Sequence, residues 1–176
     1  PKDTTADCLQ KLADPVAFEH EYGVPRVDVD SGRVKLVLAG EKRGELHAIE
    51  SEYLEPEVHS LMDVHRYTIG EEECTKLVTL FPSSSSLAPL AKKYVKWGEK
   101  ESIHQTATNS AREGEGRRWY DLTAHKRAAV ILPKIQQYRF IAPVNPLLRY
   151  QSSSLLGLYD VPIEQIELFA GLLNSS

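Results

Sequence analysis

Residues 87–97 of this 176-residue chain read LAPLAKKYVKW, and they predict a helix more clearly than any other stretch. The apolar residues recur at the i, i+3, i+4, i+7 and i+8 spacing that places them on one face of an α-helix. They are Leu87, Leu90, Ala91, Tyr94 and Val95. Ser86 is a suitable N-cap and Gly98 a suitable C-terminal stop. Three lysines would lie on the opposite face of this helix, namely Lys92, Lys93 and Lys96.

Basic residues are concentrated in and after this helix. Residues 1–82 hold 9 Lys or Arg against 17 Asp or Glu, whereas residues 92–149 hold 12 basic residues against 5 acidic ones. The net charge of −4 therefore hides an asymmetry that predicts one electropositive face, and DNA is the polyanion that we expect it to bind. Composition alone leaves the alternative that the charges are spread over a solvated surface.

A Trp-Tyr pair, Trp119 and Tyr120, lies among these basic residues. Guanidinium and ammonium groups neutralise phosphates, arginine can read guanine in the major groove, and an aromatic ring can stack where a base has left the helix. Alternatively, both rings belong to the core and only support the neighbouring arginines. The candidate DNA-binding residues are Lys92, Lys93, Lys96, Arg112, Arg117, Arg118, Trp119, Tyr120, Lys126, Arg127, Lys134, Arg139 and Arg149.

The remaining segments predict short elements of both kinds. Residues 5–22 predict a helix that Asp14-Pro15 breaks in two, and residues 24–39 predict a hairpin. A last helix is predicted over 162–173, with its inward face formed by Ile163, Ile166, Phe169, Ala170 and Leu173. Further strands are predicted at 46–49, 77–81, 119–120 and 128–132. The predicted class is α+β, with a mixed, largely antiparallel sheet and flanking helices in a single domain.

Catalytic motifs are missing from the sequence. It contains no GxxxxGK[ST] phosphate loop, no lysine two positions after an Asp or Glu, and no histidines at metal-ligand spacing. The stretch Asn145-Pro146-Leu147-Leu148 reads as a turn. Cys8 and Cys74 form neither a disulfide framework nor a zinc cluster, and no apolar run reaches transmembrane length. We therefore expect a cytoplasmic protein with no membrane partner.

Five blocks of sequence occur in an informative order. They are IESEYLEPEVHSL (49–61), YVKWGE (94–99), RWYDL (118–122), LPKI (132–135) and LLNSS (172–176). Together they resemble the target-recognition region of adenine-specific DNA methyltransferases from restriction-modification and phage-defence systems. The resemblance covers roughly residues 46–176.

The resemblance implies a specificity module without its enzyme. In that family an upstream catalytic domain binds S-adenosylmethionine, carries an N-P-P-[YF] loop and methylates an adenine flipped out of the duplex. This chain has neither that loop nor a glycine-rich cofactor site, so we expect no cofactor here and S-adenosylmethionine in the parent enzyme. Residues 46–176 would bind double-stranded DNA, with Lys134 and Arg118 as the best contacts. Residues 1–45, a helix and a hairpin, would pack on the catalytic domain of the same polypeptide, of which this chain would be a piece.

Two other functions stay open on the sequence. The chain could be a protein-interaction module whose aromatic residues and C-terminal helix contact a partner subunit, and an exposed apolar patch would favour that reading. It could also be an enzyme such as a nuclease, although the missing carboxylate–lysine pair argues against this.

Overall fold

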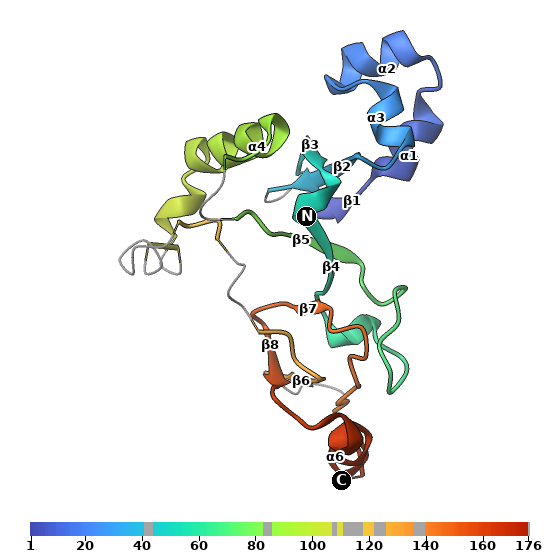
Figure 1. The fold of residues 1–176 in the computed structure, drawn as a ribbon, viewed down its shortest axis with the longest axis vertical. Helices are drawn as coiled ribbons and strands as arrows, with labels where there is room; N and C mark the ends of the chain where they lie inside the picture. The colour runs from blue at the N-terminus through green and yellow to red at the C-terminus, as the bar shows by residue number, and fades with distance from the viewer. Residues whose placement is uncertain are drawn as a thin grey trace. The chain divides into compact units, whose positions relative to one another are not determined.

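The computed structural model describes residues 1–40, 44–82, 86–106, 109–110, 118–121, 126–135 and 140–175. The chain forms two compact units, each built from segments that are distant in sequence. Unit 1 comprises Pro1–Leu54 and Thr79–Ala124, and unit 2 comprises Glu55–Val78 and His125–Ser176. The units are therefore interleaved along the chain rather than consecutive. Small, mostly antiparallel sheets accompany the helices, which confirms the predicted α+β class (Figure 1).

Unit 1 is built on a three-stranded antiparallel sheet in the order β1-β2-β3. The strands are β1 (Lys2–Asp3), β2 (Val34–Ala39) and β3 (Glu45–Glu50). Val34 pairs with Glu50 at one end of the β2–β3 ladder, and Ala39 pairs with Glu45 at the other. Strand β2 is the central strand, and its Val34, Leu36, Val37 and Ala39 are buried. Even-numbered and odd-numbered residues of a strand point to opposite faces, so the burial of both sets indicates that both faces of this strand are covered.

Three short helices pack beside this sheet: α1 (Thr5–Lys11), α2 (Pro15–Tyr22) and α3 (Arg26–Asp30). The predicted break at Asp14-Pro15 is confirmed, because the Asp14 carboxylate accepts a 2.7 Å hydrogen bond from the Ala17 N–H. These helices and β2 bury one cluster, which consists of Cys8, Phe18, Val24, Val29, Val34 and Leu36.

The first arm of the predicted 24–39 hairpin is wrong, because residues 26–30 form helix α3 instead of a strand. Arg26 explains the difference. Its guanidinium donates to the carbonyl oxygen of Leu12 at 2.5 Å at the end of α1, and it forms an i,i+4 ion pair with Asp30 at 3.2 Å. Val29 is buried, whereas Val27, two residues earlier, is 64% exposed.

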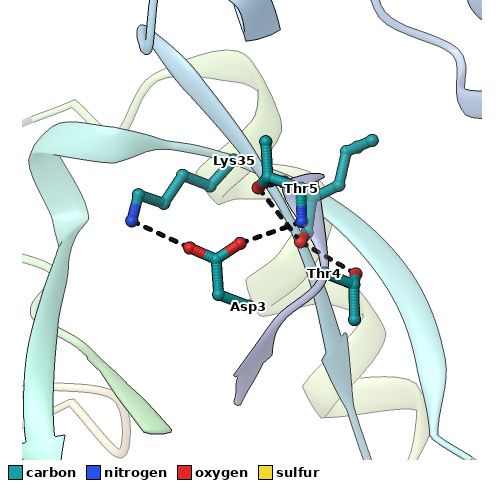
Figure 2. Close-up of polar contacts among 5 residues, drawn as sticks. Asp3, Thr4, Thr5 and Lys35 are labelled. Atoms are coloured by element: carbon teal, nitrogen blue, oxygen red, sulfur yellow. Dashed lines mark hydrogen bonds and ion pairs between the residues drawn. The ribbon is translucent and has the colours of Figure 1, made fainter. Parts of the chain in front are cut away.

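A threonine pair joins the start of the chain to the central strand of unit 1. Thr4 donates its backbone N–H and its hydroxyl to the Leu36 carbonyl oxygen, at 2.9 and 3.0 Å, and the Thr5 hydroxyl accepts from the Leu36 N–H at 3.0 Å. Figure 2 shows the Asp3 carboxylate between the Thr5 N–H and the Lys35 ammonium, both at 2.9 Å. The side chains of Thr4 and Thr5 therefore extend the β1–β2 pairing into helix α1.

Unit 2 contains two small sheets. Strands β4 (Leu54–Val58), β5 (Lys76–Thr79) and β7 (Tyr150–Gln151) form one sheet, in the order β5-β4-β7, with β4 parallel to β7. Strands β6 (Val130–Pro133) and β8 (Leu155–Leu158) form an antiparallel pair. The core between these elements consists of Val58, Leu61, Val64, Ile69, Ala128, Ile131 and Ile141.

Two asparagines hold the loops of unit 2 in place. Asn145 is 1% exposed, and its amide donates to the carbonyl oxygens of Ala128 and Arg149, both at 2.9 Å. The predicted turn at 145–148 is thereby confirmed, since the Leu148 N–H also donates to the Asn145 carbonyl oxygen at 3.0 Å. Asn174 pairs its amide with the backbone N–H and carbonyl of Ala142, both at 2.9 Å, and so fixes the end of α6 (Ile166–Leu173).

Helix α6 leaves much of its apolar surface uncovered. It follows a short 3-10 helix (Ile163–Gln165), and Ala170 is its only buried residue. The expected inward face is confirmed at Ala170, and Ile166 and Leu173 pack against the same cluster. The expectation is wrong for Ile163 and Phe169, which are 85% and 39% exposed. The helix is apolar nearly all round, so the period of 3.6 residues also placed exposed side chains on the expected inner face.

The Asp3 network predicts a pH-dependent contribution to stability. Burial raises the pKa of the Asp3 carboxyl, but the hydrogen bonds from Lys35 and Thr5 outweigh it and leave the pKa below 3.8. The carboxylate therefore stabilises the folded state above pH 3.8, and this stabilisation is lost as the pH falls through the lowered pKa. We expect Asp3→Asn to lower the free energy of unfolding at pH 7 by less than about 1 kcal/mol, because the pair is partly exposed.

Urea denaturation from pH 7 down to pH 2 measures this effect. The difference between wild type and Asp3→Asn should shrink below pH 3.8, whereas Glu19→Gln, a change at an exposed position on α2, should show no such convergence. A difference that stays constant over this range would contradict the assigned role of Asp3.

Candidate nucleic-acid interface

Helix α4 (Pro89–Lys100) carries the lysines that the sequence singled out, and a distant glutamate caps its first turn. The two carboxylate oxygens of Glu50, at the end of β3, accept hydrogen bonds from the N–H groups of Leu90 and Ala91, both at 2.8 Å. These donors have no partner within the helix, and a negative charge near them also interacts favourably with the helix dipole. Glu50 therefore ties the start of α4 to the sheet of unit 1.

The predicted helix is confirmed, but both of its predicted ends are wrong. Residue Ala88 occupies the N-cap position, and Ser86 instead lies 3.2 Å from the ammonium group of Lys92. Gly98 does not end the helix. A Cβ atom at this position would lie 2.5 Å from a ring carbon of Trp119, so a glycine inside the helix lets the indole pack directly on the backbone.

Helix α4 has one buried face and one basic face. Ala91, Val95 and Gly98 are buried. The exposed face carries the residues that we call the lysine face: Lys92, Lys93, Lys96 and Lys100. Lys100 was missed by the sequence analysis, since the predicted helix ended too early to include it. Its spacing of four residues from Lys96 is the signal that places it on the same face.

No carboxylate of the described residues neutralises the lysine face. None of its four lysines forms an ion pair within the part of the chain that the structure describes, although Glu99 is exposed on the same helix. Lys92, Lys96 and Lys100 are successive i,i+4 positions, so their Cα atoms span about 12 Å along the axis. A duplex carries one charge per about 3.4 Å along each strand, so this row can face several phosphates.

Arg118 is a further exposed cation of unit 1. Its guanidinium donates to the Tyr120 hydroxyl at 2.6 Å and lies 5.8 Å from the centre of the Tyr120 ring. Residues 119–120 form a turn rather than the predicted strand. The turn lets the two neighbouring rings pack edge to face, with centres 5.5 Å apart, so Arg118 is held by a rigid aromatic support.

Trp119 and Tyr120 are half-buried members of a larger ring cluster. The ring of Phe81 lies 5.9 Å from that of Tyr120 and 6.0 Å from that of Tyr94. Tyr94 in turn contacts Trp97 at 5.3 Å, and both approach His47 on β3. The pair therefore packs against α4, as the core alternative expects, and it also borders open space.

That space is a cavity of about 200 Å³, which we call the aromatic cavity. Its walls include the rings of Phe81, Tyr94, Trp97, Trp119 and Tyr120, together with Ile103. Burial raises the pKa of Tyr94 to about 12, and burial lowers the pKa of His47 despite the charge of Glu45. Both groups are thus uncharged at neutral pH, and the rings beside the cavity present a neutral, apolar surface.

Most of the described candidate residues of unit 2, unlike the lysines of α4, form ion pairs with carboxylates. Lys126 pairs with Asp160 at 2.6 Å, Arg127 with Glu55 at 2.8 Å and Arg149 with Glu71 at 2.8 Å. Arg127 also lies 4.6 Å from the centre of the Tyr150 ring. Of the described candidates in this unit, only Lys134, exposed just after β6, forms no ion pair with another described residue. Arg112, Arg117 and Arg139 lie outside the described residues.

Comparisons with known proteins add no family to this picture. No protein-family model, no curated protein and no solved structure matches the chain. Within the described ranges, no group of three or more His, Cys, Asp or Glu side chains is placed to hold a metal ion. In the same part of the chain, every helix is too short or too polar to cross a bilayer. The resemblance to methyltransferase recognition regions therefore stays a prediction, as does the cytoplasmic location.

The Glu50 cap predicts a specific loss of stability. Glu50→Ala removes both hydrogen bonds to the first turn of α4 and should lower the free energy of unfolding by about 1–2 kcal/mol. Glu50→Gln should cost less, because one amide oxygen can still accept. Chemical denaturation measures both, and Glu52→Ala, an exposed glutamate two residues away, is the matched control. Equal effects of Glu50→Ala and Glu52→Ala would contradict the capping role.

Proposed function

We propose that this protein is a sequence-specific DNA-binding module that directs adenine methylation by an S-adenosylmethionine-dependent catalytic domain of the same polypeptide. The observation that carries the proposal is the lysine face of α4, whose four cations have no carboxylate partner among the described residues. When these lysines bind a polyanion, counterions are released from it, and no ion pair among the described residues has to be broken first.

Two further observations support DNA as the ligand. Arg118 presents a guanidinium on a rigid ring pair of the same unit, which suits the bidentate recognition of guanine. The order of the sequence blocks, from IESEYLEPEVHSL to LLNSS, supports the methyltransferase assignment. We expect weaker phosphate contacts from Lys126, Arg127 and Arg149 than from the lysine face. Each of these three residues forms an ion pair that would have to be broken before it could bind DNA.

The salt dependence of duplex binding tests this function. With Lys92, Lys93, Lys96 and Lys100 each on a phosphate, the slope of log K against log salt should be about −3 to −4. Replacing all three of Lys92, Lys93 and Lys96 by alanine should reduce that slope by about 2 to 3, because about 0.9 is lost for each phosphate contact. Lys11→Ala, an exposed lysine at the end of α1, is the control and should leave the slope unchanged.

A base-preference measurement separates phosphate contact from sequence reading. Arg118→Ala should cost about 1–3 kcal/mol at one base position, whereas the α4 substitutions should weaken binding to all sequences alike. If no duplex binds in a salt-dependent manner at low ionic strength, DNA recognition is not the function of this chain.

A second candidate function, protein interaction with a partner subunit, is favoured by α6. Leu168 and Leu172 are each 61% exposed on adjacent turns of this helix, and a hollow of about 520 Å³ lies beside it. Residues 161–175 contain Glu164 and Glu167 and no basic residue. The partner that this surface fits is an amphipathic helix with leucines on one face and flanking lysines or arginines.

A peptide titration tests this second candidate. An amphipathic helical peptide of leucine and lysine should bind more tightly than the same pattern of leucine and glutamate, as measured by calorimetry. The double substitution Leu168→Gln, Leu172→Gln should abolish the difference, because it removes apolar surface from the patch. Val16→Gln, at a residue of α2 that is 78% exposed, is the matched control. Equal binding of both peptides would exclude this partner.

A further inference from the structure

Gly98 lies inside α4, at a position where the backbone does not require a glycine. Apart from proline, glycine is the least favourable residue in a helix interior, because it loses the most backbone freedom on folding. The helix nevertheless continues through Gly98 to Lys100, and Gly98 is not among the glycines with a positive φ. Neither a turn nor a left-handed conformation therefore accounts for this residue.

The space that Gly98 leaves open is filled by the indole of Trp119. An added Cβ atom would lie 2.5 Å from Cη2, 2.9 Å from Cζ2 and 3.6 Å from Cζ3 of this ring. At Gly171, the glycine of α6, an added Cβ atom would meet no atom within 4 Å. The approach at Gly98 is thus a specific contact between the backbone of α4 and the side chain of Trp119, and any side chain at position 98 has to displace the ring.

This contact joins the two parts of the proposed DNA-binding surface. Lys100, two residues after Gly98, belongs to the lysine face, and Arg118 directly precedes Trp119. Trp119 packs edge to face against Tyr120, whose hydroxyl accepts the 2.6 Å hydrogen bond from Arg118. Contacts to phosphates fix the register of a protein on a duplex, whereas contacts to base edges carry the sequence information. A base is read only if the arginine is held at a fixed position relative to the phosphate-binding lysines.

We propose that Gly98 is a specificity-determining residue, which positions Arg118 for base reading by letting Trp119 pack on the backbone of α4. This inference rests on the proposed function and deepens it, because it assigns sequence preference to a residue that has no side chain with which to contact a base. Gly98 acts through Trp119 and Tyr120. A change at position 98 therefore alters which duplexes are preferred, and it leaves the number of phosphate contacts as it is.

The position of Arg118 is measured first on the protein without DNA. The Arg118 guanidinium donates to the Tyr120 hydroxyl and lies beside its ring, so the Arg118 Nε–H signal in a nitrogen–proton correlation spectrum reports this contact. Arg118→Lys assigns the signal, and Tyr120→Phe shows where it lies without the hydroxyl. Gly98→Ala should move the signal toward that second position. Gly171→Ala, at a helical glycine with open space around it, is the matched control and should leave the signal unmoved.

Base preference is measured by selection from a pool of duplexes with a randomised central stretch. Arg118→Ala identifies the base position that the arginine reads, because the preference at that position is lost. Gly98→Ala should lower the preference at the same position about five- to hundredfold, which is the range that one bidentate contact provides. The slope of log K against log salt should stay unchanged, since the lysines of α4 are all present.

A double variant separates positioning from damage to the fold. Trp119→Phe removes the outer ring atoms that the methyl group of Gly98→Ala would meet. Combined with Gly98→Ala, it should return the Arg118 signal and the base preference toward their wild-type values. A loss caused by damage to α4 itself would persist in the double variant.

The inference fails if Gly98→Ala leaves the Arg118 signal in place, if it weakens all duplexes alike, or if the double variant behaves as Gly98→Ala does. Any of these results together with salt-dependent duplex binding would leave the proposed function standing. If no duplex binds at low ionic strength, the proposed function and the role of Gly98 in base reading both fall. A moved Arg118 signal would then still identify Gly98 as the residue that positions the arginine.

Discussion

The contact between Glu50 and the start of α4 organises unit 1. One carboxylate satisfies two backbone donors that the helix itself cannot, and it does so from the last residue of β3, 40 positions earlier in the chain. With the helix placed in this way, Ala91, Val95 and Gly98 face the interior and the four lysines face solvent. The direction of the lysine face and the position of Trp97 in the aromatic cavity both follow from this single anchoring point.

Local patterns in the sequence predicted local structure well. The spacing of apolar residues identified α4, and Asp14-Pro15 marked the start of α2, because both signals act within one or two helical turns. The predictions failed where a distant group decided the outcome. Glu50 replaced the expected Ser86 cap, Trp119 turned Gly98 from a helix stop into a packing site, and Arg26 turned an expected strand into α3.

The same limit applies to the candidate site. The spacing of the lysines predicted the exposed face of α4, because a helix repeats every 3.6 residues and its faces can be read from the sequence. It could not reveal that Lys126, Arg127 and Arg149 are paired, because their partners lie between 34 and 78 residues away. Nor could it reveal the aromatic cavity, whose walls come from four separate stretches between Thr79 and Tyr120. Tertiary pairing, and not residue type, separates the available cations from the occupied ones.

The interleaving of the two units has an evolutionary consequence. The chain leaves unit 1 after Leu54, returns to it at Thr79 and leaves it again after Ala124. Neither unit can therefore be acquired or replaced through a single crossover in the gene. A recombination event that exchanged the segment with α4 but kept the sheet would separate Glu50 from the helix that it caps. We therefore expect this protein to diversify through point substitutions on exposed faces more readily than through the exchange of whole segments.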